Sequence, residues 1–526
     1  MAVFGVQVVV SMIVASFLHK VFPYYSFGRW LITFRLKRYQ SPSDSLLRPH
    51  VSVPPSSTRN SSGASNSGGN NSGGRKRGSS AANQRTSTAP DTVAELRDLL
   101  STPGSEAIAA DICKLINLKQ QSNVNRLDPS LAIPKSADIK LEDLPIHKGD
   151  LLLLHYSEQL EWMINLTLAT VMVHLATVAY YHFVPSAVQT EYNLTTIWLV
   201  LVFVYVVSVL ISLTGVYFSE KLATQRSVGI VFTMLFFVFA LVILLIDEGV
   251  LDFGLEKSHK DLSLSIARLI GRIQNLNQTE EVDSRVLPMW AFKINLAILA
   301  TSLSSVLVFS GFRFAEVHFG ALRYFAMKKT LLRTVLHVCY IAPMFCLSLW
   351  IRPLSHDVIA ERNNVNLFGF AEVSYEKFRF WIIISICLLR LLMYTTYMQS
   401  FLESAKWRAQ NLRREQGRIT IKDFRDRVQN IFEFYPATGA HYLAPFILLL
   451  SLTLLLHVSS MSTLAAAQSD GEDAAKLASD EAVNVFKFSG FGVSVFHGCI
   501  SFLSWWICFT VAVTTGIGPV LREFVY

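Results

Sequence analysis

The chain has 526 residues, of which 51% are hydrophobic and only 16% are charged, and its formal net charge is +8. Soluble globular proteins contain about 25% charged residues, and the mean hydropathy of this chain is +0.37. Several uncharged windows reach 18 residues or more, the length at which a helix crosses the hydrocarbon of a bilayer. These numbers exclude a soluble enzyme, a collagen, a disulfide-stapled secreted domain and an outer-membrane barrel.

Apolar windows recur from one end of the chain to the other. Backbone groups in lipid must be hydrogen-bonded within their own segment, so each window is expected to be a helix. The sequence therefore predicts an all-α, polytopic membrane protein with about nine transmembrane helices. The nine windows are residues 2–18, 162–184, 195–218, 228–246, 290–312, 334–351, 380–402, 440–462 and 488–516.

The basic residues predict the orientation of these spans. No Lys or Arg precedes the first window, whereas Lys20 and Arg29 follow it, which favours an uncleaved helix over a signal peptide. Basic flanks stay in the cytoplasm, so the N-terminus is expected outside and the C-terminus inside. Eight basic residues between Lys406 and Arg427 lie on a predicted inner loop, and the predicted outer loop 463–485 has five acids against one lysine.

Glycosylation sequons give a second signal for orientation. Asn193 and Asn277 each begin an Asn-x-Thr sequon on the predicted outer face, where glycan acceptors must lie. The sequons at Asn60 and Asn70 fall on a predicted inner loop and are expected to stay unmodified.

The windows divide the chain into five parts. The Ser- and Asn-rich stretch 54–90 cannot bury enough apolar surface to offset its ordering entropy, so it is expected to be disordered. The basic stretch from Ala405 to Arg414 suggests either a helix that binds a membrane surface or calmodulin, or a charged connector lying on the bundle. The parts are a first transmembrane helix (1–20), a cytoplasmic, largely disordered linker with short amphipathic helices (21–160), spans 2–7 (161–398), a basic amphipathic cytoplasmic loop (399–437) and spans 8–9 (438–526).

Arg390 is the strongest candidate for a functional residue inside a span. Ten uncharged residues precede it and twelve follow it, and ionisable residues at such depth are costly and usually functional. Its guanidinium stays protonated, so it needs a carboxylate, backbone carbonyls, water or an anionic substrate. A packing role within the bundle is the alternative.

Other polar residues lie closer to the ends of the spans. Lys293, near the start of the fifth span, is either functional or a snorkelling side chain. Arg313 and Glu316 have the i, i+3 spacing of a helical ion pair, and His318 follows them. Six histidines in or near spans show no metal-binding spacing and are expected to be hydrogen-bonded packing residues. They are His174, His182, His337, His441, His457 and His497.

The last span contains small residues at four-residue spacing, namely Gly490, Ser494 and Gly498. Such a ridge lets helix backbones approach closely, so it predicts helix packing within the bundle or in a homo-oligomer. The chain has no phosphate-binding loop, catalytic triad motif, selectivity filter or voltage-sensor arginine series. We therefore expect a protein that is not an enzyme and needs no cofactor.

Several motifs resemble those of the transmembrane protein 161 family. They are Phe4 to Ser16, Pro23 to Ser26, Asp252 to Glu256, Gly311 to His318, His337 to Pro353, Leu388 to Leu391, Gly417 to Thr420 and Tyr442 to Pro445. Residues 41–150 look longer and richer in Ser and Asn than the family pattern. The resemblance implies a multi-pass protein of the cell surface or of secretory membranes that modulates potassium and calcium currents, and it also implies a stress-protection role.

Two functions are favoured over a third, a lipid-handling or scramblase-like protein, which would need a hydrophilic groove open to lipid. The first is an integral membrane regulator of ion currents and excitability that acts through membrane partners, such as ion channels or their regulators. The second is an ion or small-solute transporter or channel that uses Arg390 in a polar path. The expected partners are membrane lipids and membrane proteins, not nucleic acid. The expected location is the cell membrane, with the endoplasmic reticulum or another secretory-pathway membrane as the alternative.

Overall fold

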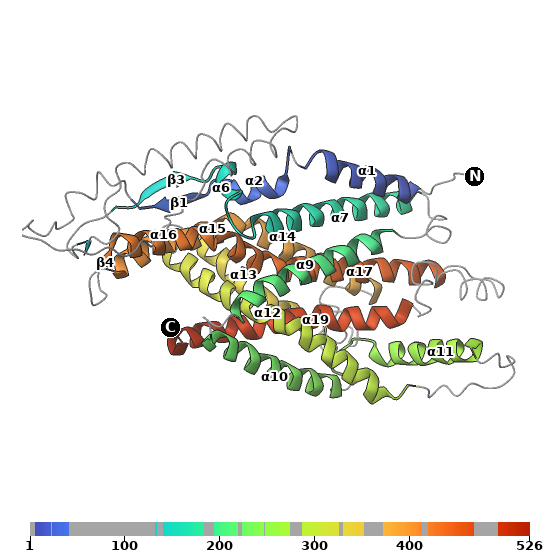
Figure 1. Ribbon diagram of the computed structural model, residues 1–526. Coiled ribbons are helices and arrows are strands. Elements are labelled where there is room, and N and C mark those ends of the chain that lie inside the picture. The colour runs from blue at the N-terminus through green and yellow to red at the C-terminus, as the bar shows by residue number, and fades with distance from the viewer. Residues whose placement is uncertain are drawn as a thin grey trace, which may run out of the picture.

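The computed structural model is a bundle of long helices (Figure 1). It describes residues 6–22, 24–41, 132–133, 140–183, 194–218, 223–246, 248–273, 287–325, 330–351, 372–412, 419–467 and 493–525. The predicted amphipathic stretch at 91–118 and the Ser- and Asn-rich stretch at 54–90 lie outside these residues.

Each of the nine apolar windows overlaps at least one helix, and further helices lie between the windows. They are α1 (Val6–Lys20), α2 (Phe27–Thr33), α6 (Lys148–Leu151), α7 (Ser157–Phe183), α9 (Thr195–Tyr217), α10 (Ala223–Leu245), α11 (Leu255–Ile273), α12 (Met289–Phe325), α13 (Thr330–Ser348), α14 (Glu372–Leu392), α15 (Tyr394–Leu412), α16 (Ile421–Glu433), α17 (Tyr435–Ala467) and α19 (Val493–Val525). The strands are β1 (Lys37–Gln40), β2 (Ala132–Ile133), β3 (Glu142–Pro145) and β4 (Ile419–Thr420).

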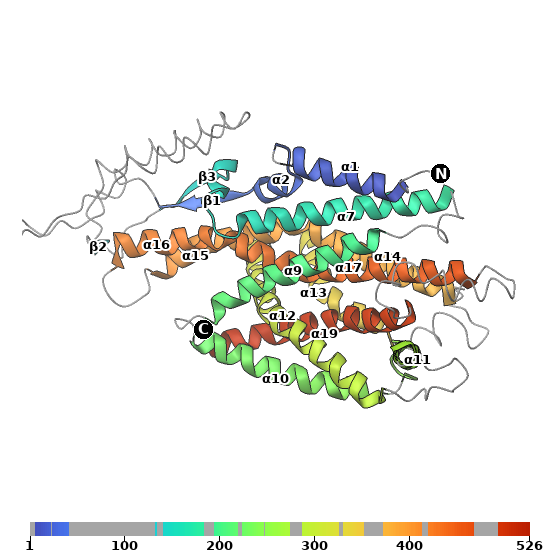
Figure 2. The same cartoon turned by 45° about the vertical axis from the view of Figure 1, so that its right-hand side comes forward.

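Seven helical segments in the described residues are long and apolar enough to cross a membrane, and an eighth is added if the bent pair α14 and α15 is one span. The first helix, α1, has 15 residues, fewer than the roughly 17–25 that a spanning helix needs. The helical membrane fold is thus as predicted, whereas the count of nine stays a prediction. The start of α1 and the end of α19 lie at opposite ends of the bundle (Figures 1 and 2), an arrangement compatible with the predicted orientation.

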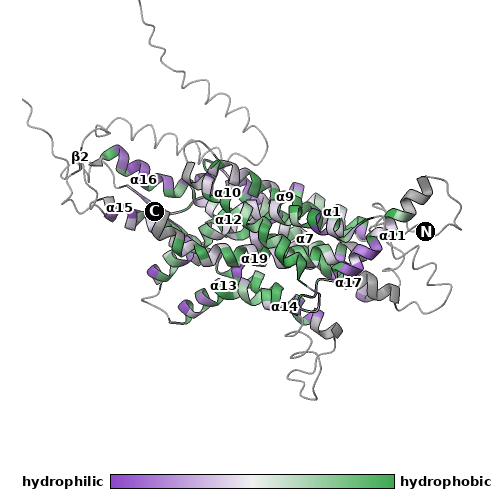
Figure 3. Cartoon of the chain, turned by 90° about the horizontal axis from the view of Figure 1, so that it is seen from below, coloured by the Kyte–Doolittle hydropathy of each residue, from purple (hydrophilic) through white to green (hydrophobic). Residues whose placement is uncertain are grey.

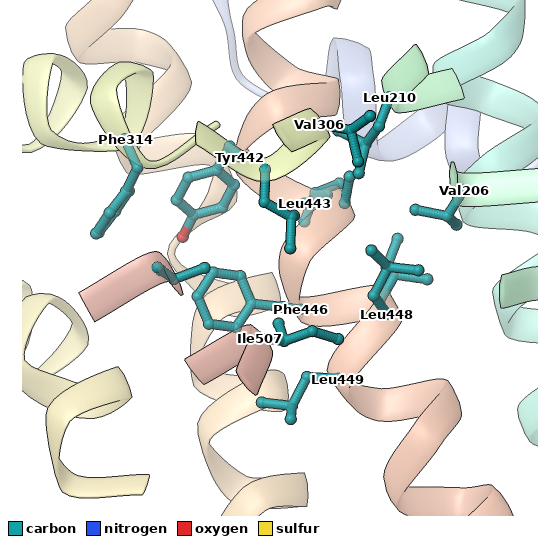
Figure 4. Close-up of a cluster of buried hydrophobic side chains, with 14 of the residues drawn as sticks. Val206, Leu210, Val306, Phe314, Tyr442, Leu443, Phe446, Leu448, Leu449 and Ile507 are labelled. Atoms are coloured by element: carbon teal, nitrogen blue, oxygen red, sulfur yellow. The ribbon is translucent and has the colours of Figure 1, made fainter. Parts of the chain in front are cut away.

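The central helix of the bundle is α17. In its apolar stretch 83% of the residues are buried, against 28% in α13 and 33% in α10. Side chains of α9, α12 and α19 pack against those of α17. Examples are Val206, Val306, Leu443, Leu448 and Ile507 (Figure 4). At these positions the axis of the bundle is therefore filled by packed apolar side chains.

Helices α12 and α19 approach closely because glycine lies at their crossing. A Cβ atom on Gly311 would lie 1.8 Å from the hydroxyl of Thr514, and one on Gly518 would lie 2.7 Å from the Cβ of Ala315. Small residues permit such close backbone contact between membrane helices. This crossing fixes α19 against the long helix α12.

The chain after α1 is held against α7. The side chain of Asn165 accepts a 2.8 Å hydrogen bond from the Gly28 amide and donates a 2.8 Å bond to the hydroxyl of Ser26. Ser26 caps the N-terminus of α2, and Arg29 forms an ion pair with Glu161 at 3.1 Å. Within the predicted linker 21–160, the described residues near both of its ends are therefore ordered.

Two small strand pairs join distant parts of the chain at the end opposite the start of α1. Strand β1 pairs antiparallel with β3, and β2 pairs with β4. Tyr39 of β1 donates a hydrogen bond to Glu403 of α15, and burial together with this bond raises the pKa of Tyr39. Residues 37–40 are thus attached to α15.

The basic loop contains α16, whose apolar face is already covered. Thr420 caps its N-terminus by accepting a 3.1 Å bond from the Asp423 amide, as the capping-box pattern indicates. Phe424, Val428 and Ile431 are buried, while the hydrophilic face remains outside (Figure 3). Helix α16 thus lies on the bundle, whereas the two interpretations of the basic stretch 405–414, which precedes α16, stay predictions.

Candidate functional site

Arg390 lies in the last turn of α14, just before the chain bends by 41° into α15. Its side chain is completely buried. The hydroxyl of Tyr442, on α17, donates a 2.8 Å hydrogen bond to the carbonyl of Arg390. Carbonyls at a helix end lack intrahelical donors, so Tyr442 supplies one at the bend.

Aromatic rings cover both faces of the guanidinium. Its carbon atom lies 3.7 Å from the ring centre of Phe314 and 4.0 Å from that of Phe446, with Tyr442 at 5.7 Å. Cations are attracted to ring faces, by about 2 kcal/mol or more when desolvated. We call Arg390 with Phe314, Tyr442 and Phe446 the arginine cage.

The guanidinium donates a hydrogen bond to a backbone carbonyl that a proline leaves without a helical donor. Nη2 of Arg390 donates to the carbonyl of Cys339 at 2.7 Å. Cys339 lies four residues before Pro343, which is inside α13. Proline has no N–H, so the carbonyl four residues earlier loses its helical donor. Arg390 therefore satisfies a carbonyl that Pro343 leaves unpaired.

The same arrangement occurs in α19. Thr515 lies four residues before Pro519, which is also inside its helix. The hydroxyl of Tyr340, on α13, donates to the carbonyl of Thr515 at 2.7 Å. Two interior prolines in this bundle thus create acceptors that side chains from neighbouring helices fill.

The remaining donors of Arg390 have no partner in the part of the chain that the structure describes. Nε and Nη1 are buried without a hydrogen bond, and no ion pair involving Arg390 occurs among the described residues. A protonated group in this state can anchor helices through its carbonyl bond and its rings. It can also bind a water or an anion if the cage opens.

A second polar cluster surrounds His441 of α17. Its ring nitrogens lie 3.4 Å from the Tyr217 hydroxyl and 3.0 Å from the Ser310 hydroxyl. Arg313 donates to the same Tyr217 hydroxyl at 3.0 Å and to Glu316 at 2.8 Å. The helical pair expected from the i, i+3 spacing is present, and it is half-buried beside a hydrogen-bonded histidine.

His318 does not join Arg313 and Glu316, although it follows them in sequence. Its ring is buried and stacks on Tyr340 at 4.3 Å. Its Nδ1 lies 3.2 Å from the Tyr397 hydroxyl. It therefore belongs with α13 and α15, on the side of α12 where the arginine cage lies.

Lys293 lies in the first turns of α12 and lines a cavity of about 140 Å³ with Glu248 and Glu256. It is far along the chain from Arg390, and the two are not in contact in the structure. Among the described residues, no three His, Cys, Asp or Glu side chains come together as metal ligands.

The remaining candidate residues are placed only in part. Asn193, Asn277 and Gly490 lie outside the described residues, as does the side chain of Ser494. Gly498 packs against α11, where a Cβ atom would lie 2.1 Å from the Ser258 hydroxyl. At Gly498 the small-residue ridge therefore serves packing within the chain.

Sequence reasoning did not identify the rings of the arginine cage or the role of Pro343. A proline inside a predicted span was the signal available for Pro343, because it implies a free carbonyl four residues earlier. The rings of Phe314, Tyr442 and Phe446 are ordinary in sequence and gain their role only from helix contacts.

One comparison with known proteins identifies the family. The family model described as predicted transmembrane protein 161AB matches residues 2–89 and 89–526. No solved structure matches the chain. The match covers essentially the whole sequence, so the chain belongs to the transmembrane protein 161 family.

Proposed function

We propose that this integral membrane protein regulates ion currents, including potassium and calcium currents, through contacts with other membrane proteins, and does not itself conduct ions. The family resemblance suggests the process. The observation that carries the proposal is the closed state of the bundle axis, in which α17 is buried and Arg390 is enclosed by rings.

A conducting protein needs a path lined by water or polar groups through the hydrocarbon. At Leu443, Leu448 and Leu449 of α17 the described side chains are instead apolar and closely packed (Figure 4), and the polar residue His441 of the same helix is hydrogen-bonded to neighbouring helices. The cage adds Phe314 and Phe446 at the depth of Arg390. This packing favours a scaffold that acts on partner proteins, and it disfavours a channel or transporter.

The surfaces available to partners differ in chemistry. The lipid-facing sides of α10 and α13 expose apolar residues such as Val238 and Ile341. By contrast, α16 exposes charged residues at one end of the bundle, namely Lys422, Asp426 and Arg427. We assign partner contact to these two kinds of surface, and we place the protein in the cell membrane, with a secretory-pathway membrane as the alternative.

Voltage-clamp recording tests the proposal. Potassium and calcium currents are recorded in cells that lack the chain and again after it is expressed. The currents should change in amplitude or gating, and channel subunits should co-purify with the chain from the same membranes. The proposal would be contradicted if the currents are unchanged and no channel subunit co-purifies with the chain.

One observation favours the second function, a transporter or channel. Nε and Nη1 of Arg390 are buried without partners among the described residues, and a passing anion or polar solute would satisfy them. In that case purified protein would produce a flux that Arg390→Leu abolishes at unchanged surface expression. An equal fall in surface expression would assign Arg390 to folding.

A further inference from the structure

A cavity of about 140 Å³ lies where α10 ends and where α11 and α12 begin. A single buried water needs roughly 10–15 Å³ of such space, so the cavity has room for several heavy atoms. Its walls combine apolar side chains with three charged ones. The lining residues are Ile243, Leu244, Leu245, Ile246, Glu248, Leu251, Phe253, Leu255, Glu256, Met289 and Lys293.

Hydrogen bonds and packing hold the residues of the cavity wall in place. Glu248 accepts a 2.7 Å hydrogen bond from the amide of Glu256 at the start of α11, which uses one of its two carboxylate oxygens. Leu251 forms a β-bridge with Ile351. Phe253 is buried, with its ring 5.4 Å from that of Phe502. The carboxylate of Glu248 is thus held in place beside an apolar floor.

The end of α10 and an exposed tryptophan indicate that the cavity lies at the headgroup layer of a bilayer. The apolar helix α10 ends at Leu245, and Leu245 itself lines the cavity. Trp290, which is 67% exposed, lies three residues before Lys293, and exposed tryptophans concentrate at the membrane interface. The charged groups of the cavity therefore lie where lipid headgroups meet the acyl chains.

A lipid-facing stripe leads away from the cavity along α10. Val231, Val238, Val242 and Leu245 are all more than half exposed, and their spacing of seven, four and three residues places them on one helix face. Acyl chains that lie along this stripe bring a headgroup to the cavity opening.

We propose that this cavity binds the headgroup of phosphatidylethanolamine. The lining carries two carboxylates and one ammonium group. An ethanolamine ammonium has N–H donors for Glu248 and Glu256, while its phosphate pairs with Lys293. A choline headgroup has no N–H to donate, and a glycerol headgroup has no cation to balance the two carboxylates.

The test uses the full chain in nanodiscs that contain equal amounts of phosphatidylethanolamine, phosphatidylcholine and phosphatidylglycerol, with retained lipid counted by native mass spectrometry. The wild-type chain should retain phosphatidylethanolamine preferentially. Losing one charge-assisted hydrogen bond should weaken retention on the order of tenfold, so Glu256→Gln and Lys293→Gln should each do so. Retention of phosphatidylglycerol at the level of phosphatidylethanolamine would overturn the assignment.

Two controls separate the site from general folding or charge effects. Lys293→Arg keeps the charge and should keep the lipid. Lys260→Gln changes an exposed lysine of α11 that does not line the cavity and should have no effect. A loss with Lys260→Gln as large as with Lys293→Gln would contradict the proposal.

Free phosphoethanolamine tests whether the ligand is a lipid. It carries the same charges without acyl chains, so it should not displace the bound lipid at equal concentration. Equal competition would show that α10 contributes nothing and would overturn the assignment to a lipid. None of these results depends on ion currents, so this inference stands or fails separately from the proposed function.

Discussion

Replacing Arg390 and Pro343 together gives the sharpest test of how the cage is held. The bond from Arg390 Nη2 to the Cys339 carbonyl is 2.7 Å long, and a hydrogen bond to a charged group contributes about 1.5–3 kcal/mol. Arg390→Met removes this bond and leaves the carbonyl unpaired, since Pro343 has no N–H. Pro343→Ala restores the helical donor.

The two substitutions should therefore be coupled. In the Pro343→Ala background the carbonyl has its own donor, so Arg390→Met should cost about 1–2 kcal/mol less than in the wild type, within the range for residues that share a partner. Arg390→Met removes the interactions of the guanidinium with Phe314 and Phe446 in both backgrounds, so their contribution cancels. The free energy gained by no longer burying a charge cancels in the same way. The coupling isolates the carbonyl bond.

Unfolding equilibria in mixed micelles, followed by tryptophan fluorescence, give the four free energies of this cycle. Arg390→Met with Pro519→Ala is the control, because Pro519 frees a carbonyl that Tyr340 satisfies. That pair should be additive within about 0.5 kcal/mol. Additivity of Arg390→Met with Pro343→Ala would refute the reasoning.

Two further substitutions test helix contacts, each with a matched control. Gly311→Ala should lower the free energy of unfolding by about 1–3 kcal/mol through overpacking, because the new Cβ would lie 1.8 Å from the Thr514 hydroxyl. Gly320→Ala is the control, because its new Cβ would meet no atom of another described element within 4 Å, so it should not destabilise. Equal losses from the two substitutions would contradict the close crossing. Asn165→Ala should lower the free energy of unfolding by about 1–3 kcal/mol, since it leaves buried polar groups unpaired. Asn295→Ala should be near neutral in the same micelle assay, because the exposed Asn295 side chain bonds to the Ala291 carbonyl of its own helix.

The positions of the apolar helices could be predicted well from the sequence, because length and hydropathy alone identify a candidate membrane-spanning helix. The window 380–402 illustrates the limit. It is a bent pair, α14 and α15, and uniform hydropathy does not reveal the bend. Helix α12 runs from Met289 to Phe325, well beyond the apolar window, because its polar end packs against neighbouring helices.

The segment 247–289 lies between the fourth and fifth apolar windows and has no apolar window of its own, yet it contains α11. This helix packs on α19 through the close contact between Ser258 and Gly498. Its formation is a tertiary effect, since short isolated helices are marginal in water and gain stability from packing an amphipathic face.

That Arg390 lies in an apolar helix was readable from its sequence neighbours, but its partners were not. They come from α12, α13 and α17, and one of them is a backbone carbonyl freed by Pro343. His318 shows the same limit, because Arg313, five residues earlier, bonds to Tyr217 of α9, whereas His318 faces Tyr397 of α15. Which helices touch is decided by packing across the whole bundle.

The most direct test of the central claim is ion and small-solute flux into proteoliposomes of the purified, folded chain. The filled axis around α17 and the enclosed Arg390 predict no flux above that of empty liposomes, in the wild type and in Arg390→Leu alike. A flux in the wild type that disappears in a folded Arg390→Leu variant would contradict the account and make the protein a transporter or channel.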